Sequence, residues 1–457
     1  MNNLLLSVLF GSLMLAFNTP ATAFNGPSAD SRPNIILISI ETTRADHLGC
    51  YGYKRNTSPT IDRLAQEGIR FENMFGARGL TWPALTSVMT SLYPVNHGVR
   101  ENGHQVFPHI THLAEILKVN GYNCAAFLGN ADSAVWKGFD TKVRARRHYL
   151  TRSSTKWLHE HHRDRIFLWV HFFEPHKPYM PPPSYDKMFT DPNYNGRVNG
   201  SSRQMASITA RGINLRPADL NHLIALYDGS IRYVDYQITR ILSELKGLDI
   251  YDDSLIIVTA DHGEDLYQHN KYFFHAGSIH DSSLHIPFIM KLPNGDKGPM
   301  SIPDIVESID IAPTILELAS LTAPDAFEGQ SLMPLIRGQN NPGAFQAAYS
   351  EWRNMILSIR TDRYRYIYNP NNHHPKVLSR FPDWGYFVAE EELYDIQKDP
   401  GESDNIVLRE PEVANELKNR LFEWSNYKRW KGNDSIEKQD KFIPPEIIER
   451  LRSLGYL

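Results

Sequence analysis

The sequence predicts an α/β fold in which a central, mostly parallel sheet is flanked by helices and followed by a smaller C-terminal α+β subdomain. Two observations carry this prediction. Continuous apolar runs of strand length alternate with segments of helical spacing, which is typical of parallel sheets covered on both faces. From about residue 345 this alternation gives way to shorter and more polar segments. We therefore predict a main domain at residues 33–345 and the subdomain at 346–457.

Four apolar runs are the predicted buried strands. They are residues 34–40 (NIILISI), 123–129 (NCAAFLG), 166–171 (IFLWVH) and 255–260 (LIIVTA). One predicted helix begins at Pro59, with Ser58 as its N-cap, and ends at Gly68, because Ser and Pro favour the start of a helix and Gly its end. Another predicted helix spans residues 223–245.

Polar residues stand directly after these four runs. They are Glu41, Asn130, His171 and the pair Asp261-His262. Because the carboxyl ends of parallel strands lie at one edge of a sheet, ligands and chemistry gather there. We therefore expect these side chains to converge on one site.

The C-terminal segments show a different pattern. Residues 356–369 (ILSIRTDRYRYIYN) alternate like one exposed antiparallel strand, and residues 391–405 are typical of a strand followed by a turn. A charged helix is predicted over residues 411–430.

Composition narrows the class of protein. The chain has 457 residues, with 48 Lys and Arg against 52 Asp and Glu, a net charge of −4. This near-neutral balance argues against a nucleic-acid partner bound by phosphate neutralisation. Two cysteines exclude a disulfide scaffold and a thiolate zinc site. Nineteen histidines indicate metal or acid–base chemistry instead.

The N-terminus carries an export pattern. Residues 4–17 form an apolar run, and Ala21-Thr22-Ala23 follows as a cleavage site. The run is shorter than the ~20 residues of a spanning helix. We predict a signal peptide at residues 1–23, a periplasmic or secreted location, and no integral membrane segment after cleavage. Because the first three residues lack a positive charge, a retained anchor is the alternative.

Six motifs, in order along the chain, resemble those of the sulfatase branch of the alkaline phosphatase superfamily. They are IETTRADHLGCYGY (40–53), SPTIDRLAQEGIRFEN (58–73), LTWPALTSVMTSLYPVNHGVRENG (80–103), HFFEPHKPY (171–179), TADHGEDL (259–266) and HAGSIHDSSLHIPFI (275–289). The C-terminal segments RTDRYRYIY (360–368), ELYDIQKDPGE (392–402) and LRSLGYL (451–457) fit as well. The resemblance covers nearly the whole mature chain and implies the sulfatase-like fold.

The chain departs from this family at the nucleophile. Sulfatases of this family carry Cys-x-Pro-Ser-Arg, whose Cys matures to formylglycine. Here Thr81 stands at the Cys position and Leu85 at the Arg position. Of the two usual lysines, one corresponds to Asn130 and the other falls near Ala276, beside His275.

The candidate metal ligands resemble those of phosphoethanolamine and phosphoglycerol transferases. These enzymes pair a Glu after the first strand with a Thr nucleophile and an Asp-His pair, which here are Glu41, Thr81, Asp261 and His262. The resemblance implies that these four residues hold a divalent metal, and the number of metal ions stays open. Carboxylate and imidazole ligands suit Zn²⁺ or Mn²⁺, and oxygen-rich sites suit Ca²⁺ or Mg²⁺. The identity of the metal stays open.

Further residues have candidate catalytic roles. We expect Thr81 to lie at a helix N-terminus, where unpaired N–H groups favour a nucleophilic oxygen and an incoming oxyanion. His176 would contact the ester oxygens or the leaving group, or join Glu174 in a second metal site. His275 is a candidate general acid for the leaving oxygen. Asn130 would hydrogen-bond a nonbridging oxygen.

These residues predict a metal-dependent hydrolase that cleaves phosphate esters, with sulfate esters as the second option, through Thr81 and a covalent intermediate. The substrate would be the ester of a small molecule, a glycan or a lipid headgroup. Three alternatives stay open: a phospho-alcohol transferase acting on a glycan or lipid, a sulfatase that works without formylglycine, and a non-catalytic protein that binds an anionic glycan.

Overall fold

The computed structural model describes residues 32–130, 133–211, 214–269, 273–275, 277–295, 297–339, 344–352, 356–370 and 389–427. The predicted signal peptide, Ala276 and the motif at residues 451–457 lie outside these ranges, as does the end of the predicted C-terminal helix. Among the described helices, none is both long and apolar enough to cross a membrane. The division of the chain at residue 345 stays a prediction.

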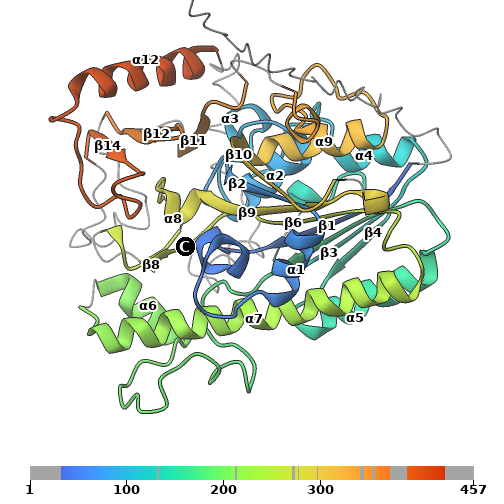
Figure 1. The fold of residues 1–457 in the computed structure, drawn as a ribbon, viewed down its shortest axis with the longest axis horizontal. Helices are drawn as coiled ribbons and strands as arrows, with labels where there is room; N and C mark the ends of the chain where they lie inside the picture. Colours follow the sequence, from blue (N-terminus) through green and yellow to red (C-terminus); the bar gives the residue numbers. More distant parts are fainter. Residues whose placement is uncertain are drawn as a thin grey trace, which may run out of the picture.

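In the described part of the chain, an eight-stranded sheet forms the centre of the molecule, in the order β10-β2-β9-β6-β1-β5-β3-β4 (Figure 1). Its strands are β1 (Asn34–Ile40), β2 (Ile69–Phe75), β3 (Asn123–Leu128), β4 (Thr141–Arg144), β5 (Ile166–Phe172), β6 (Ser254–Ala260), β9 (His285–Lys291) and β10 (Met300–Glu307). Neighbouring strands run parallel except where β9 pairs with β2 and β6. The predicted mostly parallel α/β sheet is confirmed.

The four strands predicted from apolar runs are neighbours in this sheet, in the order β6-β1-β5-β3. All side chains of β5 and β6 are buried, as expected for strands covered on both faces. Ile40, the last residue of β1, lies opposite Phe172 of β5 and Ala260 of β6. The strands therefore end level, and the residues that follow them meet at one edge.

Helices cover both faces of the sheet (Figure 1). One face carries α1 (Pro59–Glu67), α5 (His148–His161) and α7 (Pro217–Gly247), and the other carries α2 (Thr81–Thr90), α4 (Leu113–Val119) and α9 (Ile311–Leu318). Alternate residues of β1 point to opposite faces. Ile36 and Ile38 therefore pack in one core cluster with Ile238 of α7, and Leu37 packs in another with Leu85 of α2.

Helix α1 starts and ends where predicted, but Ser58 does not cap it. The Ser58 hydroxyl donates a hydrogen bond to Asp62 Oδ1 at 2.9 Å and accepts one from Gly49 N at 2.8 Å. Asp235 of α7 accepts instead from Thr60 N at 2.9 Å and from the next backbone N–H at 3.0 Å. A charged carboxylate from a neighbouring helix has displaced the hydroxyl, because charge-assisted hydrogen bonds are the stronger ones.

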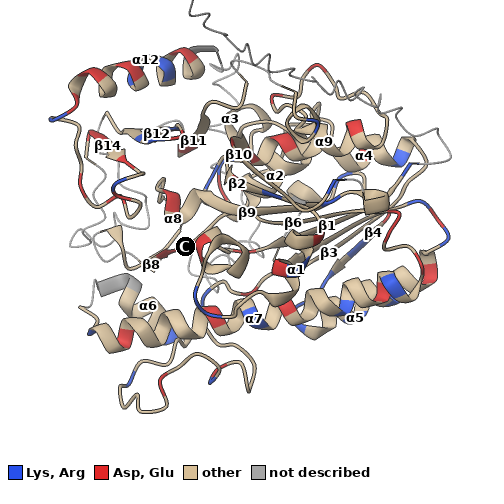
Figure 2. Cartoon of the chain, viewed as in Figure 1, with Lys and Arg blue, Asp and Glu red and all other residues tan. Residues whose placement is uncertain are grey.

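Shorter elements lie in the connections. They are α3 (Pro94–His97), α6 (Ser202–Arg211), α8 (Asp281–Leu284), α10 (Met333–Ile336) and the two-stranded pair β7 (Asp265–Leu266) and β8 (Phe273–Phe274). Acidic and basic side chains mix on the outer helices, while the central strands carry few of them (Figure 2).

The C-terminal subdomain is an antiparallel sheet, β11-β12-β13-β14, with a helix packed on it. Its elements are β11 (Ala348–Trp352), β12 (Ile356–Arg360), β13 (Tyr364–Tyr368), β14 (Glu391–Asp395) and α12 (Pro411–Tyr427). The prediction of one exposed strand over residues 356–369 is wrong, because a turn at residues 361–363 divides it into two strands. Every side chain of β12 is buried. Leu357 packs in the cluster with α12, and Ile356 packs in the cluster with Phe75 of the main sheet.

Candidate active site

The ends of β1, β3, β5 and β6 bring the predicted polar residues together at one edge of the sheet. Glu41 N donates to Phe172 O at 2.9 Å, which continues the pairing of β1 with β5 by one residue. Thr42 N donates to Asp261 Oδ1 at 3.0 Å, which ties the end of β1 to the end of β6. Asn130 follows β3 and reaches Glu41 from the other side, with its Nδ2 at 3.1 Å from Glu41 Oε1.

Thr81 is the first residue of α2, as predicted, and its side chain is completely buried. Its hydroxyl donates a hydrogen bond to Glu41 Oε1 at 3.0 Å, and its oxygen lies 3.5 Å from His262 Nε2. The next backbone N–H, that of Trp82, donates to Asn102 Oδ1 at 3.0 Å. The positive end of the helix dipole therefore acts directly on the threonine oxygen.

Glu41 is a buried carboxyl group at the centre of the site. Burial raises its pKa to about 7, against the opposing effects of His262 and of the hydrogen bonds from Asn130 and Thr81. Oε1 accepts both of these hydrogen bonds, whereas Oε2 is buried without a hydrogen-bond partner. One oxygen of the carboxyl group thus accepts a hydrogen bond from the nucleophile, and the other has no hydrogen-bond partner.

In Asp261, as in Glu41, one carboxylate oxygen accepts hydrogen bonds and the other does not. Asp261 Oδ1 accepts from the backbone N–H groups of Thr42 and His262, while Oδ2 is buried without a hydrogen-bond partner. Burial raises the pKa of Asp261 above its ordinary value. His262 Nδ1 lies 2.8 Å from Gly263 O, which can only accept, so Nδ1 carries the proton. Nε2 of the neutral ring therefore presents a lone pair, 3.3 Å from Asp261 Oδ2.

Two further histidines face Glu41. Ser39 Oγ accepts from the indole N–H of Trp169 and so donates its own proton to His171 Nδ1, each at 2.9 Å. This arrangement leaves the proton of a neutral His171 on Nε2, which lies 3.6 Å from Glu41 Oε2. His176 donates from Nδ1 to Lys177 O at 2.6 Å, and its Nε2 lies 3.9 Å from Glu41 Oε1. Burial lowers the pKa of both histidines.

His275 lies beside this group, with its ring centroid 4.3 Å from that of His262 and 5.2 Å from that of His176. Its Nδ1 is 3.0 Å from Glu264 Oε1, and the other oxygen of Glu264 accepts from Tyr179 OH at 3.0 Å. Burial raises the pKa of Glu264 to about 8 and lowers that of His275 well below its ordinary value. Sequence reasoning did not single out Glu264 as the partner of His275, although it stands in the DHGE motif.

The other residues considered from the sequence lie elsewhere or have other partners. The carboxylate of Glu174 pairs with Arg147, Nε to Oε1 at 3.5 Å. Leu85 packs in the core cluster beneath the sheet, so α2 offers no cation at that position. His285 Nε2 donates a hydrogen bond to Glu72 O of β2 at 2.8 Å.

The site contains the types of donor atom that bind a divalent cation, but these atoms are not arranged around a common point. Glu41 Oε2 and Asp261 Oδ2 are buried without hydrogen-bond partners, and His262 Nε2 presents its lone pair next to Asp261. Facing lone pairs repel one another unless a proton or a cation lies between them. Yet within the described ranges, no group of three or more His, Cys, Asp and Glu side chains is placed so that it could hold a metal ion.

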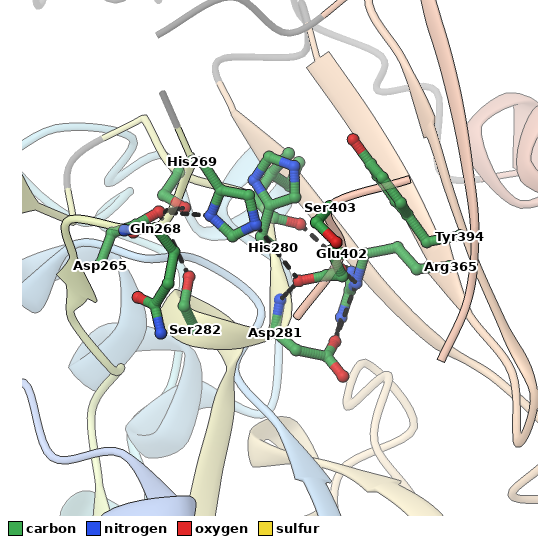
Figure 3. Close-up of polar contacts among 12 residues, drawn as sticks. Asp265, Gln268, His269, His280, Asp281, Ser282, Arg365, Tyr394, Glu402 and Ser403 are labelled. Carbon is green, nitrogen blue, oxygen red and sulfur yellow. Dashed lines mark hydrogen bonds and ion pairs between the residues drawn. The ribbon is translucent and has the colours of Figure 1, made fainter. Parts of the chain in front are cut away.

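The loop that follows His262 is anchored to the C-terminal subdomain by a buried charged network (Figure 3). His269 Nδ1 lies 2.6 Å from Asp265 Oδ2, and its ring stacks on that of His280 at 3.7 Å between centroids. Arg365 of β13 contacts Asp281 Oδ1 at 2.9 Å and Glu402 Oε1 at 3.0 Å. This network, which sequence reasoning missed, joins residues far apart in the chain.

Comparison with known proteins identifies the family. The profile described as Sulfatase matches residues 33–321, and that described as N-sulphoglucosamine sulphohydrolase, C-terminal, matches residues 269–427. The chain is 26% identical to an arylsulfatase of Clostridium perfringens, with 83% of this chain and 91% of that protein covered. It is 22% identical to an N-acetylglucosamine-6-O-sulfatase of Bacteroides thetaiotaomicron, over 89% of this chain and 88% of that one.

Solved structures share the fold. A protein solved in complex with its substrate D-glucosamine-2-N,6-O-disulfate matches with a TM-score of 0.72 and 20% identity, covering 89% of this chain and 100% of that one. The phosphonate monoester hydrolase of Agrobacterium radiobacter matches with a TM-score of 0.70 and 22% identity, covering 86% and 95%. Since the Sulfatase profile spans more than half of the sequence, the chain belongs to the sulfatase family and is an ester hydrolase of the sulfatase/alkaline phosphatase superfamily.

Proposed function

We propose that the protein hydrolyses phosphate esters through Thr81, with a covalent phosphothreonine intermediate. The observation that carries this proposal is the position of the Thr81 hydroxyl, at the start of α2 and 3.0 Å from Glu41 Oε1. A hydroxyl is a weak nucleophile until a base or a positive charge activates it. Both the carboxylate and the helix dipole lie where activation requires them.

The proton of Thr81 has a defined acceptor. As Thr81 Oγ1 attacks the phosphorus, its proton passes to Glu41 Oε1, along the hydrogen bond that already joins them. Asn130 Nδ2 donates to the same Glu41 oxygen at 3.1 Å and so holds the carboxylate in the position that Thr81 needs. Asn130 would also bind a nonbridging oxygen once the substrate enters. In the second half-reaction water attacks the phosphothreonine, and His275, which gave its proton to the leaving group, takes a proton from the water. The bond between phosphorus and Thr81 Oγ1 breaks, and Glu41 returns its proton to Thr81 Oγ1.

A divalent cation completes the proposal. Members of the superfamily are generally metal-dependent. Glu41, Asp261 and His262 would hold the ion beside Thr81 through Oε2 and Oδ2, which have no hydrogen-bond partner, and through Nε2, which lies 3.5 Å from Thr81 Oγ1. When bound, it would polarise the ester and lower the charge repulsion among these groups.

The leaving group needs a proton donor. We assign this role to His275. Its Nε2 would give a proton to the leaving oxygen while its Nδ1, 3.0 Å from Glu264 Oε1, takes the proton held by Glu264, whose pKa burial raises to about 8. His176, whose ring lies 5.2 Å from that of His275, would contact the ester oxygens. The substrate is the ester of a small molecule, a glycan or a lipid headgroup, and the export pattern at residues 1–23 supports a location in the periplasm or outside the cell.

Sulfate esters are the second candidate substrate, because the relatives found by sequence carry the name sulfatase. The replacements at Thr81, Leu85 and Asn130 favour phosphate over sulfate, since they remove the formylglycine precursor and two of the usual cations. A Thr81 nucleophile without formylglycine would form a sulfothreonine in that case.

The test measures p-nitrophenol release from matched aryl phosphate, phosphate diester and sulfate substrates, with Mn²⁺, Zn²⁺, Ca²⁺ or EDTA. We expect turnover of a phosphate ester that EDTA abolishes and that Thr81→Ala lowers by at least ~100-fold. Thr86→Ala is the matched control, because Thr86 is a buried threonine of the same helix whose Oγ1 has no hydrogen-bond partner. Wild-type turnover in Thr81→Ala contradicts the nucleophile, and turnover of the sulfate alone reverses the substrate order. Product formation that depends on an added acceptor alcohol identifies a transferase.

A further inference from the structure

The proposed active site binds a doubly or singly charged tetrahedral anion, yet the position that supplies a guanidinium in sulfatases is Leu85 here. Leu85 is 1% exposed and belongs to the core cluster with Val88 and Met89. Asn130, at the position of a usual lysine, carries no charge. A cationic side chain for the substrate, in addition to the proposed metal ion, must therefore come from another element.

Arg146 lies in the connection between β4 and α5, at the rim of the same sheet edge. Its Nε donates to Gly129 O at 3.2 Å, and Gly129 directly precedes Asn130. Its guanidinium carbon lies 3.8 Å from the centroid of the Phe173 ring, which in turn lies 4.9 Å from the ring of His176. The guanidinium is thus held between the segments that follow β3 and β5, and both segments carry proposed active-site residues.

Arg146 contacts the segments that carry the site. Its Nε is hydrogen-bonded to the carbonyl group that directly precedes Asn130, and its stacking partner Phe173 contacts the ring of His176. The side chain is exposed, and among the described residues its Nε makes the only hydrogen bond of the guanidinium. Stacking on Phe173 fixes the plane of the group, so its remaining N–H donors are presented to solvent in a preorganised fork.

Neighbouring cations are used differently. Arg147 pairs with Glu174 and donates to Met180 O at 3.1 Å. Arg78 is buried and pairs with Glu101 at 3.1 Å. Lys177 is buried with its Nζ 3.4 Å from the Phe274 ring centroid, and burial lowers its pKa to about 8. Of these four cations, Arg146 is the one that is both fixed in orientation and exposed to an incoming ligand.

We propose that Arg146 binds two nonbridging oxygens of the substrate's sulfate or phosphate group, and so replaces from the β4–α5 connection the guanidinium that α2 lacks. This inference rests on the proposed function, because it assumes that the oxyanion sits at the edge occupied by Thr81. A guanidinium fork matches two oxygens of a tetrahedral anion, which an ammonium group does not.

The test measures equilibrium binding of inorganic phosphate and of inorganic sulfate by calorimetry at low ionic strength, without any ester. Losing one charge-assisted, bidentate contact raises Kd by about 10-fold to 100-fold, which we expect for Arg146→Met. Arg146→Lys should recover only part of this loss. Arg152→Met is the control. This substitution removes the same charge from an exposed position of α5. The relative affinity of the two anions distinguishes a phosphate site from a sulfate site.

Each outcome decides the proposal. Wild-type affinity in Arg146→Met overturns it, and so does an equal loss in Arg152→Met, which would show a general effect of net charge. A wild-type protein that binds neither anion also overturns it. Since binding requires no turnover, Thr81→Ala should bind the anions with the same dependence on Arg146. Anion binding through Arg146 in a protein that cleaves no ester would keep this inference and reject the proposed function.

Discussion

Gly129 sets how closely the segments after β3 and β5 approach each other. A Cβ atom at this position would lie 2.8 Å from both Cβ and N of Phe173, and 3.2 Å from His171 O. Because two of these contacts are backbone atoms, the end of β5 would have to shift. We expect Gly129→Ala to lower the free energy of unfolding by about 1–3 kcal/mol, as measured by urea denaturation.

A second glycine provides the control for this prediction. Gly247 is the last residue of α7, and a Cβ atom there would meet nothing within 4 Å. Gly247→Ala should leave stability unchanged or raise it by up to ~1 kcal/mol, since alanine has the better helix propensity. Equal destabilisation by both substitutions would contradict the steric argument for Gly129.

Some residues of the candidate site could be placed from the sequence and others could not. Glu41 and Asp261 were placed together because each follows a buried strand, and parallel strands end at a common edge. The hydrogen bond from Tyr179 to Glu264 had no such signal. It joins two loops, and loop conformation depends on contacts that no short-range pattern records.

At the scale of elements, His269 in the connection between β7 and β8 should make the stability of the fold depend on pH. Burial alone would lower the pKa of His269, but the charge and hydrogen bond of Asp265, helped by Glu402 and Glu392, raise it to about 9. The unfolded value is about 6.5. A raised pKa in the folded state means that protonated His269 stabilises the fold fully below pH 6.5 and loses this effect as the pH rises through 9.

His269→Gln should therefore destabilise the protein by up to about 3 kcal/mol at pH 6 and by progressively less at pH 7.5 and pH 9. The measurement is the free energy of unfolding in denaturant for both proteins at each pH. A difference that stays constant from pH 6 to pH 9 would mean that His269 contributes packing against His280 rather than charge.

At the level of elements, four buried strands were predictable because each is a continuous apolar run of strand length, whereas the buried run of β9 (HIPFIMK) was not recognised as a strand. Strands β2 (IRFENMF) and β10 (MSIPDIVE) were not predicted, because polar residues interrupt both runs. They join the sheet through long-range pairing with each other and with β9. The turn at residues 361–363 was missed because charged residues fit both a turn and an exposed strand.

At the scale of the whole molecule, a buried charged contact joins the main domain to the C-terminal subdomain. Arg365 is 1% exposed, and it contacts the carboxylates of Asp281 and Glu402. Removing one member of a buried charged network leaves the others uncompensated. We expect Arg365→Met to cost about 3–5 kcal/mol of unfolding free energy.

Arg363→Met is the matched control for this prediction. Its side chain is 42% exposed and its pair with Asp395, at 2.8 Å, lies at the surface of the same sheet. Its loss should cost less than about 1 kcal/mol. Hydrogen exchange should show the loop after His262 opening together with β12 and β13 in Arg365→Met only. Exchange confined to the C-terminal sheet would disprove a shared structural unit.

The contact of Arg365 with Asp281 and Glu402 also determines when the active site can form. Thr81, Asp261 and His262 all precede Arg365 and Glu402 in the chain. A growing polypeptide thus carries its reactive groups before it carries the residues that brace the loop beside them (Figure 3). We expect the chain to remain inactive until the C-terminal sheet has folded against the main sheet, so that completion of this sheet is the step that produces active enzyme.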